Sequence, residues 1–212
     1  MKMLLTSGGL KNHTLISALT GLVGIPLKDI KIAFIPTASD LTLAGKSYAL
    51  QQKLALKKLG VAEVKSVDIA KLPREQWLAL LENAHVIYVN GGNTTHLMRC
   101  VAKSCLQDEL PRLLKSKVYV GVSAGSYIAT PDTRLNSDQT PEILPALNYV
   151  DFGIQAHYKS NSFKLAKTLE LVKERTKDCP YPVYVLDDQS AIKIVDNSIE
   201  VLSEGDWLLL NP

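Results

Sequence analysis

Short apolar runs of strand length alternate with longer amphipathic segments along the first 122 residues, and this alternation constrains the fold more than any other feature. The runs are rich in β-branched residues and lie at 2–6, 30–36, 64–69, 85–89 and 118–122. Apolar residues at helical spacing fill the gaps between them. Strands that alternate with helices pair in parallel. The sequence therefore predicts an α/β fold: a doubly wound, mostly parallel sheet with helices on both faces.

The pattern changes after residue 129. Residues 130–145 are polar and contain three prolines, which indicates an excursion over a site at the sheet edge. Residues 149–158 have the alternation of a strand that ends at His157, and 163–174 have the spacing of an amphipathic helix. We expect a C-terminal β meander from three short strands and a last edge strand, at 183–186, 191–195, 199–202 and 207–210.

Length and composition limit the function classes. A chain of 212 residues without linker or internal repeat is expected to form a single domain, 1–212. The net charge is only +3, from 24 basic and 21 acidic residues, so neither nucleic acid nor an anionic membrane is an expected partner. No apolar run reaches membrane-spanning length, and the first residues lack the core of a signal peptide.

The three cysteines, Cys100, Cys105 and Cys179, give no disulfide framework and fit a reducing compartment. We therefore expect a cytoplasmic protein, monomeric or homodimeric. No His/Cys cluster has metal-ligand spacing, so the sequence predicts no metal and no cofactor.

The segment Gly121–Gly125, G-V-S-A-G, carries the clearest chemical signal. It fits G-x-S-x-G, follows the predicted strand at 118–122 and precedes a segment able to start a helix. A nucleophile elbow needs this order, with small residues where the chain doubles back. Ser123 is then an exposed nucleophile at a strand end. The alternative is an ordinary Gly/Ser turn, which the pattern alone does not exclude.

A nucleophilic serine needs a base, and four histidines are available. His85 begins an apolar strand and His13 precedes a helix, which favour packing and solvated roles respectively. His96 lies in a helix first turn, where the macrodipole disfavours the imidazolium that a base must become. His157 ends a predicted strand and polar residues follow it, so it is the leading candidate, although position alone leaves the choice open.

An acyl-transfer site also needs donors for an oxyanion. Gly91 and Gly92 end the strand that should neighbour the elbow strand, and glycines let backbone N–H groups turn toward such a charge. The amide of Ala124 could do the same. A loop that simply requires positive φ is the alternative, and both can hold.

Three motifs together resemble one family. They are V-N-G-G-N-T-T-H-L-M from Val89, G-V-S-A-G-S, and V-D-F-G-I-Q-A-H-Y ending at Tyr158. In this order, over nearly the whole chain, they resemble the aspartyl dipeptidase (peptidase E) family of serine peptidases, related to cyanophycinase. The resemblance implies a three-layer sandwich similar to class I glutamine amidotransferases, which is flavodoxin-like. It implies Ser123 as nucleophile, His157 as base, and an oxyanion hole from Gly91, Gly92 and Ala124.

The resemblance leaves the acid open. The family's acidic residue after the late strand, usually a glutamate, falls on Asp188, and Asp187 or Asp138 could serve instead. Candidate substrate-binding residues are Asn93, Asp138 and Arg134, with Asp138 or Glu142 as acceptors of a substrate ammonium. The family's arginine after the catalytic histidine has no counterpart in 160–168. Lys159, Lys164 or Arg134 could substitute for it as a point charge, but without bidentate geometry.

The sequence thus predicts a serine peptidase that cleaves N-terminal bonds of dipeptides or short peptides through an acyl-enzyme. Strict aspartyl dipeptidase activity is an alternative that the missing arginine disfavours. An esterase or amidase on the same fold would use the same machinery. The non-enzyme alternative is a small-molecule or nucleotide-binding module, although neither G-x-G-x-x-G nor G-x-x-x-x-G-K-[ST] occurs.

Overall fold

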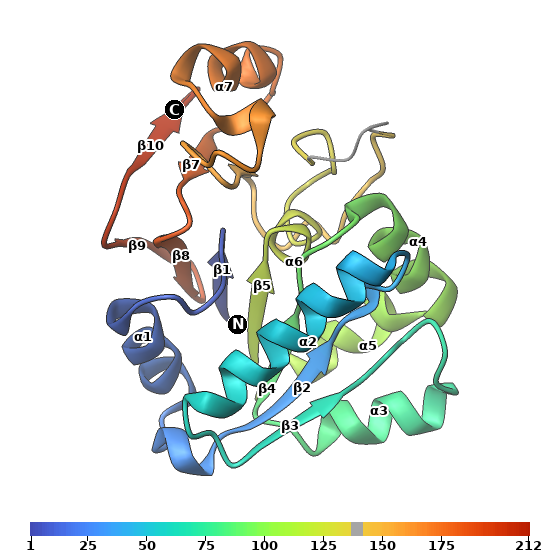
Figure 1. The fold of residues 1–212 in the computed structure, drawn as a ribbon. Helices are drawn as coiled ribbons and strands as arrows, with labels where there is room; N and C mark the ends of the chain where they lie inside the picture. The colour runs from blue at the N-terminus through green and yellow to red at the C-terminus, as the bar shows by residue number, and fades with distance from the viewer. Residues whose placement is uncertain (137–141) are drawn as a thin grey trace.

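The computed structural model describes residues 1–136 and 142–212, with the side chain of residue 165 excepted, and its centre is a seven-stranded sheet (Figure 1). The strand order is β3-β2-β4-β5-β1-β8-β9. The first five strands in this order pair in parallel with one another. β8 pairs antiparallel with β1, and β9 pairs antiparallel with β8, so these two strands form an antiparallel edge. The bounds are β1 Lys2–Thr6, β2 Lys31–Ile35, β3 Glu63–Ser66, β4 Val86–Val89, β5 Val118–Val122, β8 Ser190–Val195 and β9 Ser198–Ser203.

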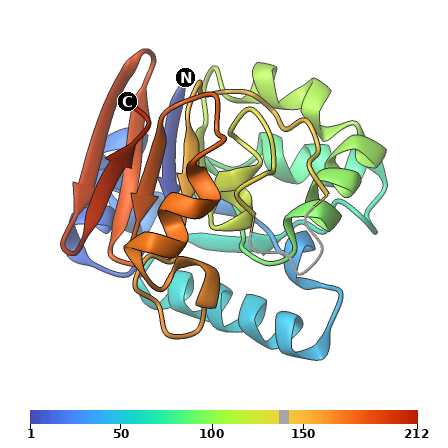
Figure 2. The ribbon, with the colours of Figure 1, turned by 90° about the horizontal axis from the view of Figure 1, so that it is seen from above.

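Helices cover both faces of this sheet, as the sequence predicts. Successive side chains of a strand point to opposite faces, and both faces carry apolar side chains that the helices bury. In β1, Leu4 packs in one core cluster and Met3 and Leu5 in the other. The first cluster includes residues of α1 and α2, and the second includes residues of the later helices; Figure 2 shows this layering from above. The helices are α1 His13–Val23, α2 Leu43–Lys58, α3 Arg74–Glu82, α4 Thr94–Ser104, α5 Leu106–Leu113 and α6 Ala124–Tyr127.

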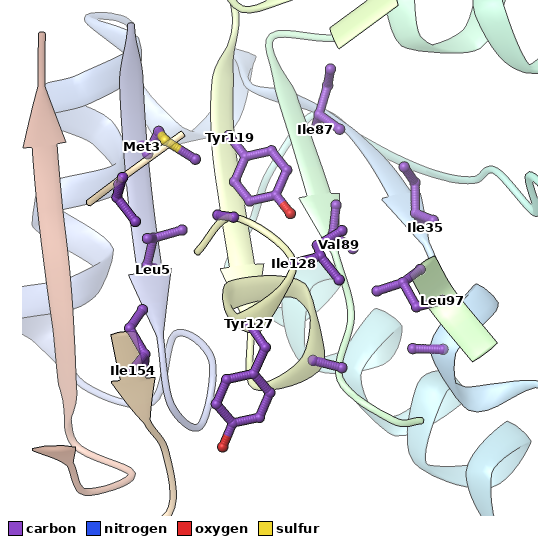
Figure 3. Close-up of a cluster of buried hydrophobic side chains, with 14 of the residues drawn as sticks. Met3, Leu5, Ile35, Ile87, Val89, Leu97, Tyr119, Tyr127, Ile128 and Ile154 are labelled. Atoms are coloured by element: carbon purple, nitrogen blue, oxygen red, sulfur yellow. The ribbon is translucent and has the colours of Figure 1, made fainter. Parts of the chain in front are cut away.

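The short helix α6 is held in the second cluster. Figure 3 shows Tyr127, its last residue, and the following residue Ile128 among strand residues that include Leu5 and Val89, with Ile154 nearby. All these side chains are buried. The end of the β5–α6 turn is therefore fixed by core packing rather than by the turn alone.

The expected C-terminal meander is wrong in its first and last strands. A separate three-stranded sheet, ordered β10-β7-β6, contains both of them, and it lies with α7 above the main sheet in Figure 1. Between β7 and β8, Asp187 accepts hydrogen bonds from Ser190 Oγ and the amide of Gln189, and this turn carries the chain to the main sheet. The bounds are β6 Gly153–Gln155, β7 Val183–Leu186, β10 Trp207–Leu210 and α7 Leu169–Thr176.

Two further elements are shorter than predicted. The strand expected at 149–158 pairs only over Gly153–Gln155, because His157 turns to φ 63° and its amide donates to Ser7 Oγ. The helix expected from Phe163 begins at Leu169, because Thr168 caps it by accepting from the amide of Leu171. Short 3₁₀ turns occupy Leu27–Asp29, Thr37–Ser39 and Lys164–Ala166. Among the described residues, no helix has the length and apolarity to cross a bilayer.

Candidate active site

Ser123 stands at the turn between β5 and α6 in a strained backbone conformation. Its φ is 47° and its ψ −105°, a region that non-glycine residues rarely occupy. The strain is held by β1: the carbonyl of Thr6 accepts from the amide of Ser123 and from Ser126 Oγ. This is the strand–turn–helix arrangement of a nucleophile elbow.

The elbow requires glycine on both sides of the serine. A Cβ on Gly125 would lie 2.1 Å from the carbonyl oxygen of Val89, and one on Gly121 would lie 2.6 Å from that of Gly125. Both distances are far below van der Waals contact. The expectation that small residues are needed where the chain doubles back is met at these two positions.

The structure brings His157 and Asp188 to Ser123. His157 Nε2 lies 2.9 Å from Ser123 Oγ, and its Nδ1 lies 2.7 Å from Asp188 Oδ1. The imidazole is buried, and the ring of Phe163 stacks on it with centroids 3.7 Å apart. If Nδ1–H donates to the carboxylate, Nε2 is left free to accept the serine proton.

Asp188 is held by the loop after β1 as well as by the histidine. Ser7 Oγ donates to Asp188 Oδ1 at 3.1 Å, and Lys11 Nζ lies 2.8 Å from Oδ2. Burial alone would raise the pKa of Asp188, but the hydrogen bonds and positive charges of His157 and Lys11 outweigh it and hold this pKa well below its usual range. The carboxylate of Asp188 is therefore ionised at neutral pH.

The glycine pair after β4 is braced by the Thr37–Ser39 segment. Ser39 Oγ donates to the carbonyl of Gly91, and the amide of Asn93 donates to the carbonyl of Ala38 at 2.7 Å. Gly92 has φ 142°, and a Cβ there would lie 2.2 Å from the carbonyl oxygen of Ala38. The pair thus needs its glycines for conformation and close approach.

The same loop leaves donors available. Within the described residues, none of the amides of Gly91, Gly92 and Ala124 donates to a backbone carbonyl. Gly91 lies beside the nucleophile, since a Cβ built on it would be 3.4 Å from Cβ of Ser123. These amides are therefore candidates for holding negative charge on a reacting oxygen.

These groups open onto a pocket of about 420 Å³. Its walls come from the loop after β1, the start of α2, the glycine pair, the serine–histidine–aspartate set and Phe163. The described lining residues are Gly8, Lys11, Ser39, Ala44, Gly45, Tyr48, Gln52, Gly91, Gly92, Ser123, His157, Phe163 and Asp188. A volume of this size accommodates a small peptide end rather than a folded chain.

Several candidates from the sequence are not at this pocket. Asp187 is wrong as an alternative acid, because its oxygens accept from Gln189, Ser190 and the amide of Asp206 in the turn before β8. Arg134 is wrong as a substrate-binding residue, because its guanidinium is paired with Asp132.

Two more assignments change. The side-chain oxygen of Asn93 accepts from the amide of His96 and caps α4, and Asn93 is not among the described residues that line the pocket. Glu142 forms an ion pair with Arg99. Asp138 lies outside the described residues.

The other histidines have structural partners. His85 Nδ1 accepts from the amide of Lys31, and His96 Nε2 lies 2.9 Å from Asp40 Oδ1. His13 is near Ser17 on the surface of α1. Across the described residues no group of three or more His, Cys, Asp or Glu is placed to hold a metal ion.

Sequence reasoning missed Ser7, Lys11, Tyr48 and Phe163. Nothing in the sequence of the loop after β1 indicates that Ser7 and Lys11 contact Asp188, which is more than 170 positions away. Tyr48 and Phe163 fall in segments with helical spacing, where an aromatic residue usually indicates core packing.

Comparison with known proteins identifies the family. A family model described as peptidase family S51 matches residues 3–202. The chain belongs to peptidase family S51. Its relatives include a Nostoc protein named peptidase E, 30% identical over 181 residues, which are 81% of this chain and 72% of the relative. An uncharacterised peptidase from Listeria innocua is 31% identical over 79% of this chain and 82% of its own length.

Solved structures of similar fold agree with this membership. A crystal structure of a Listeria monocytogenes EGD-e protein, assigned provisionally to peptidase E, superposes with a TM-score of 0.77 at 26% identity. The match covers 96% of this chain and 98% of that one. A peptidase from an acI-B1 actinobacterium shares the fold, with a TM-score of 0.68 at 16% identity. This S51 protein is therefore a peptidase by family, on a mixed α/β fold with a large, mostly parallel sheet.

Proposed function

We propose that this S51 peptidase is a serine-type exopeptidase that removes the N-terminal residue of dipeptides or short peptides through an acyl-enzyme. The observation that carries the proposal is the pair of distances at His157: 2.9 Å to Ser123 Oγ and 2.7 Å to Asp188 Oδ1. Nucleophile, base and orienting acid are all within hydrogen-bonding range.

The proposed chemistry follows from that arrangement. Ser123 Oγ attacks the scissile carbonyl carbon while its proton passes to His157 Nε2. Asp188 fixes the tautomer and stabilises the imidazolium. The amides of Ala124 and of Gly91 or Gly92 hold the oxyanion, each donor contributing on the order of 3 kcal/mol. The imidazolium then protonates the leaving amine, and water releases the acyl group by the same steps in reverse.

We do not restrict the proposal to N-terminal aspartate. The resemblance carried by the three sequence motifs implies that preference, yet the described pocket lining contains no arginine, and its lysine, Lys11, is paired with Asp188. The substrate remains a short peptide, with Asp-Xaa dipeptides as one member of the class to be tested.

The test is hydrolysis of a panel of dipeptides and aminoacyl amides, with Asp-Xaa and simple esters included, and labelling by a fluorophosphonate. Ser123→Ala should abolish both turnover and labelling while retaining the thermal midpoint. Ser47→Ala, an exposed serine beside the pocket on α2, is the matched control and should behave as wild type. Undiminished peptide turnover by Ser123→Ala would exclude the mechanism.

Two other results would replace the proposal. Ester turnover without peptide turnover would indicate an esterase. A nucleotide-induced rise of the thermal midpoint without fluorophosphonate labelling would indicate a binding module.

A further inference from the structure

Tyr48 is the one described aromatic hydroxyl that lines the pocket, and nothing in the chemistry above uses it. It lies in the second turn of α2, which Thr42 caps by accepting from the amide of Gly45. A Cβ on Gly45 would lie 2.3 Å from the carbonyl oxygen of Ser39, so the first turn of α2 packs directly on the segment that braces the glycine pair. Residues three apart share a helix face, which directs Tyr48 toward the same pair.

The phenol and the nucleophile flank one small volume above Gly91. A Cβ built on Gly91 would be 3.2 Å from Tyr48 Oη and 3.4 Å from Cβ of Ser123. No side chain of Gly91 fills that volume, because the residue has none. A substrate carbonyl carbon bonded to Ser123 Oγ would bring its oxygen into the same region.

Tyr48 Oη is also free to act as a donor. No hydrogen bond joins it to another residue in the described parts of the chain, whereas buried tyrosine hydroxyls usually have a partner. Burial, with a smaller contribution from the negative charge of Asp188, raises the pKa of Tyr48 to about 12. The phenol therefore keeps its proton throughout the pH range in which the enzyme could work.

We propose that Tyr48 is a third, side-chain donor of the oxyanion hole, whose O–H group binds the oxygen that becomes negative when Ser123 attacks. This inference rests on the proposed function. In this proposal α2 positions the phenol donor of Tyr48, whereas the glycine loop positions the backbone amides of Gly91 and Gly92. A preorganised donor of this kind binds the transition state more strongly than the substrate, so its loss lowers kcat rather than raising KM.

The test is Tyr48→Phe, which keeps the ring and its packing. We expect kcat for the best panel peptide to fall at least about tenfold with KM changed less than about threefold. Binding of a matched aminoacyl aldehyde, which forms a tetrahedral adduct at Ser123, should weaken by a similar factor. The control is Tyr184→Phe, whose ring packs on Phe152 and Trp207 in the second sheet, and it should retain wild-type kcat.

Gly91→Ala provides a second variant, which changes the same volume from the side of the glycine loop. Its methyl group would occupy the volume between Tyr48 and Ser123. We expect the double variant to be no slower than Gly91→Ala alone within about twofold, because both changes remove the same interaction.

The outcomes separate the inference from the proposed function. Wild-type kcat in folded Tyr48→Phe, a loss confined to KM, or fully multiplicative losses in the double variant would each overturn the role of Tyr48 while leaving the serine mechanism intact. Wild-type protein that neither turns over the panel nor reacts with fluorophosphonate would overturn both.

Discussion

Substitution by alanine at two adjacent glycines of the site should affect different properties: Gly92→Ala should lower stability, and Gly91→Ala should lower activity while stability is nearly unchanged. At Gly92, φ is 142° and a Cβ would lie 2.2 Å from Ala38 O and 2.8 Å from the nitrogen of Ser39, all of them backbone contacts. An ordinary non-bonded separation is about 3.5 Å, so Gly92→Ala must move the Thr37–Ser39 segment by roughly 1 Å. That movement breaks the hydrogen bond from the amide of Asn93 to Ala38.

The energies follow from these contacts. Backbone strain at Gly92→Ala costs about 1–3 kcal/mol, and a lost buried hydrogen bond adds about 1–3 kcal/mol. Gly91 lacks positive φ, and its Cβ would meet Tyr48 Oη at 3.2 Å, which a small ring movement relieves. Gly91→Ala should therefore change stability by no more than about 1 kcal/mol.

The assay is thermal and urea unfolding of both variants with peptide turnover measured on the folded protein. A chain of this size loses roughly 3 °C per kcal/mol, so Gly92→Ala should melt about 10 °C below wild type. Gly91→Ala should melt within about 3 °C of wild type yet lose activity, since its methyl group fills the space beside Ser123. Equal midpoints for the two variants, or a less stable Gly91→Ala, would refute the reasoning.

Three further predictions concern the acid and its neighbours. Asp188→Asn should lower kcat by about 10²–10⁴, measured on the best panel substrate. Because the folded-state pKa of Asp188 is depressed, the stability that ionised Asp188 contributes is present above about pH 4 and is lost as the pH falls further. The difference in unfolding free energy between wild type and Asp188→Asn should therefore shrink in acid. Lys11→Met removes a cation that shares the charge of Asp188 and so favours the imidazolium, which should move the acid limb of the kcat/KM profile to higher pH; an unmoved limb would contradict this. Asp187→Asn disturbs the turn before β8 and should lower the thermal midpoint while reducing kcat far less than Asp188→Asn does; equal losses of kcat would count against the assignment of the acid.

Features carried by neighbouring residues could be predicted from the sequence. The five parallel strands could be predicted from short apolar runs of strand length, each of which involves only neighbouring residues. The signature of the elbow is equally local, because Gly121, Ser123 and Gly125 lie within five positions. The strained backbone of Ser123 is held by residues of the same turn and by hydrogen bonding to Thr6 of β1.

Features that join distant residues could not be predicted in this way. Periodicity did not separate Asp187 from Asp188, because both lie in the turn after β7, where hydrogen bonds rather than strand alternation set the side-chain directions: Asp187 accepts within the turn and Asp188 meets His157. The early end of β6 has a long-range origin as well, since the amide of His157 donates to Ser7 Oγ, 150 positions earlier, and the imidazole stacks on Phe163.

The amino-acid sequence by itself therefore indicated the α/β layering, the nucleophile elbow and the glycine loop, because each has a signature within a few neighbouring residues, although distant segments such as Thr6 and Ser39 hold the elbow and the glycine loop in place. Only the tertiary structure decided that Asp188 is held by His157, Ser7 and Lys11, and that Tyr48 faces Gly91. The physical reason is that hydrogen bonds and steric contacts act over a few ångströms, whatever number of residues separates the groups along the chain.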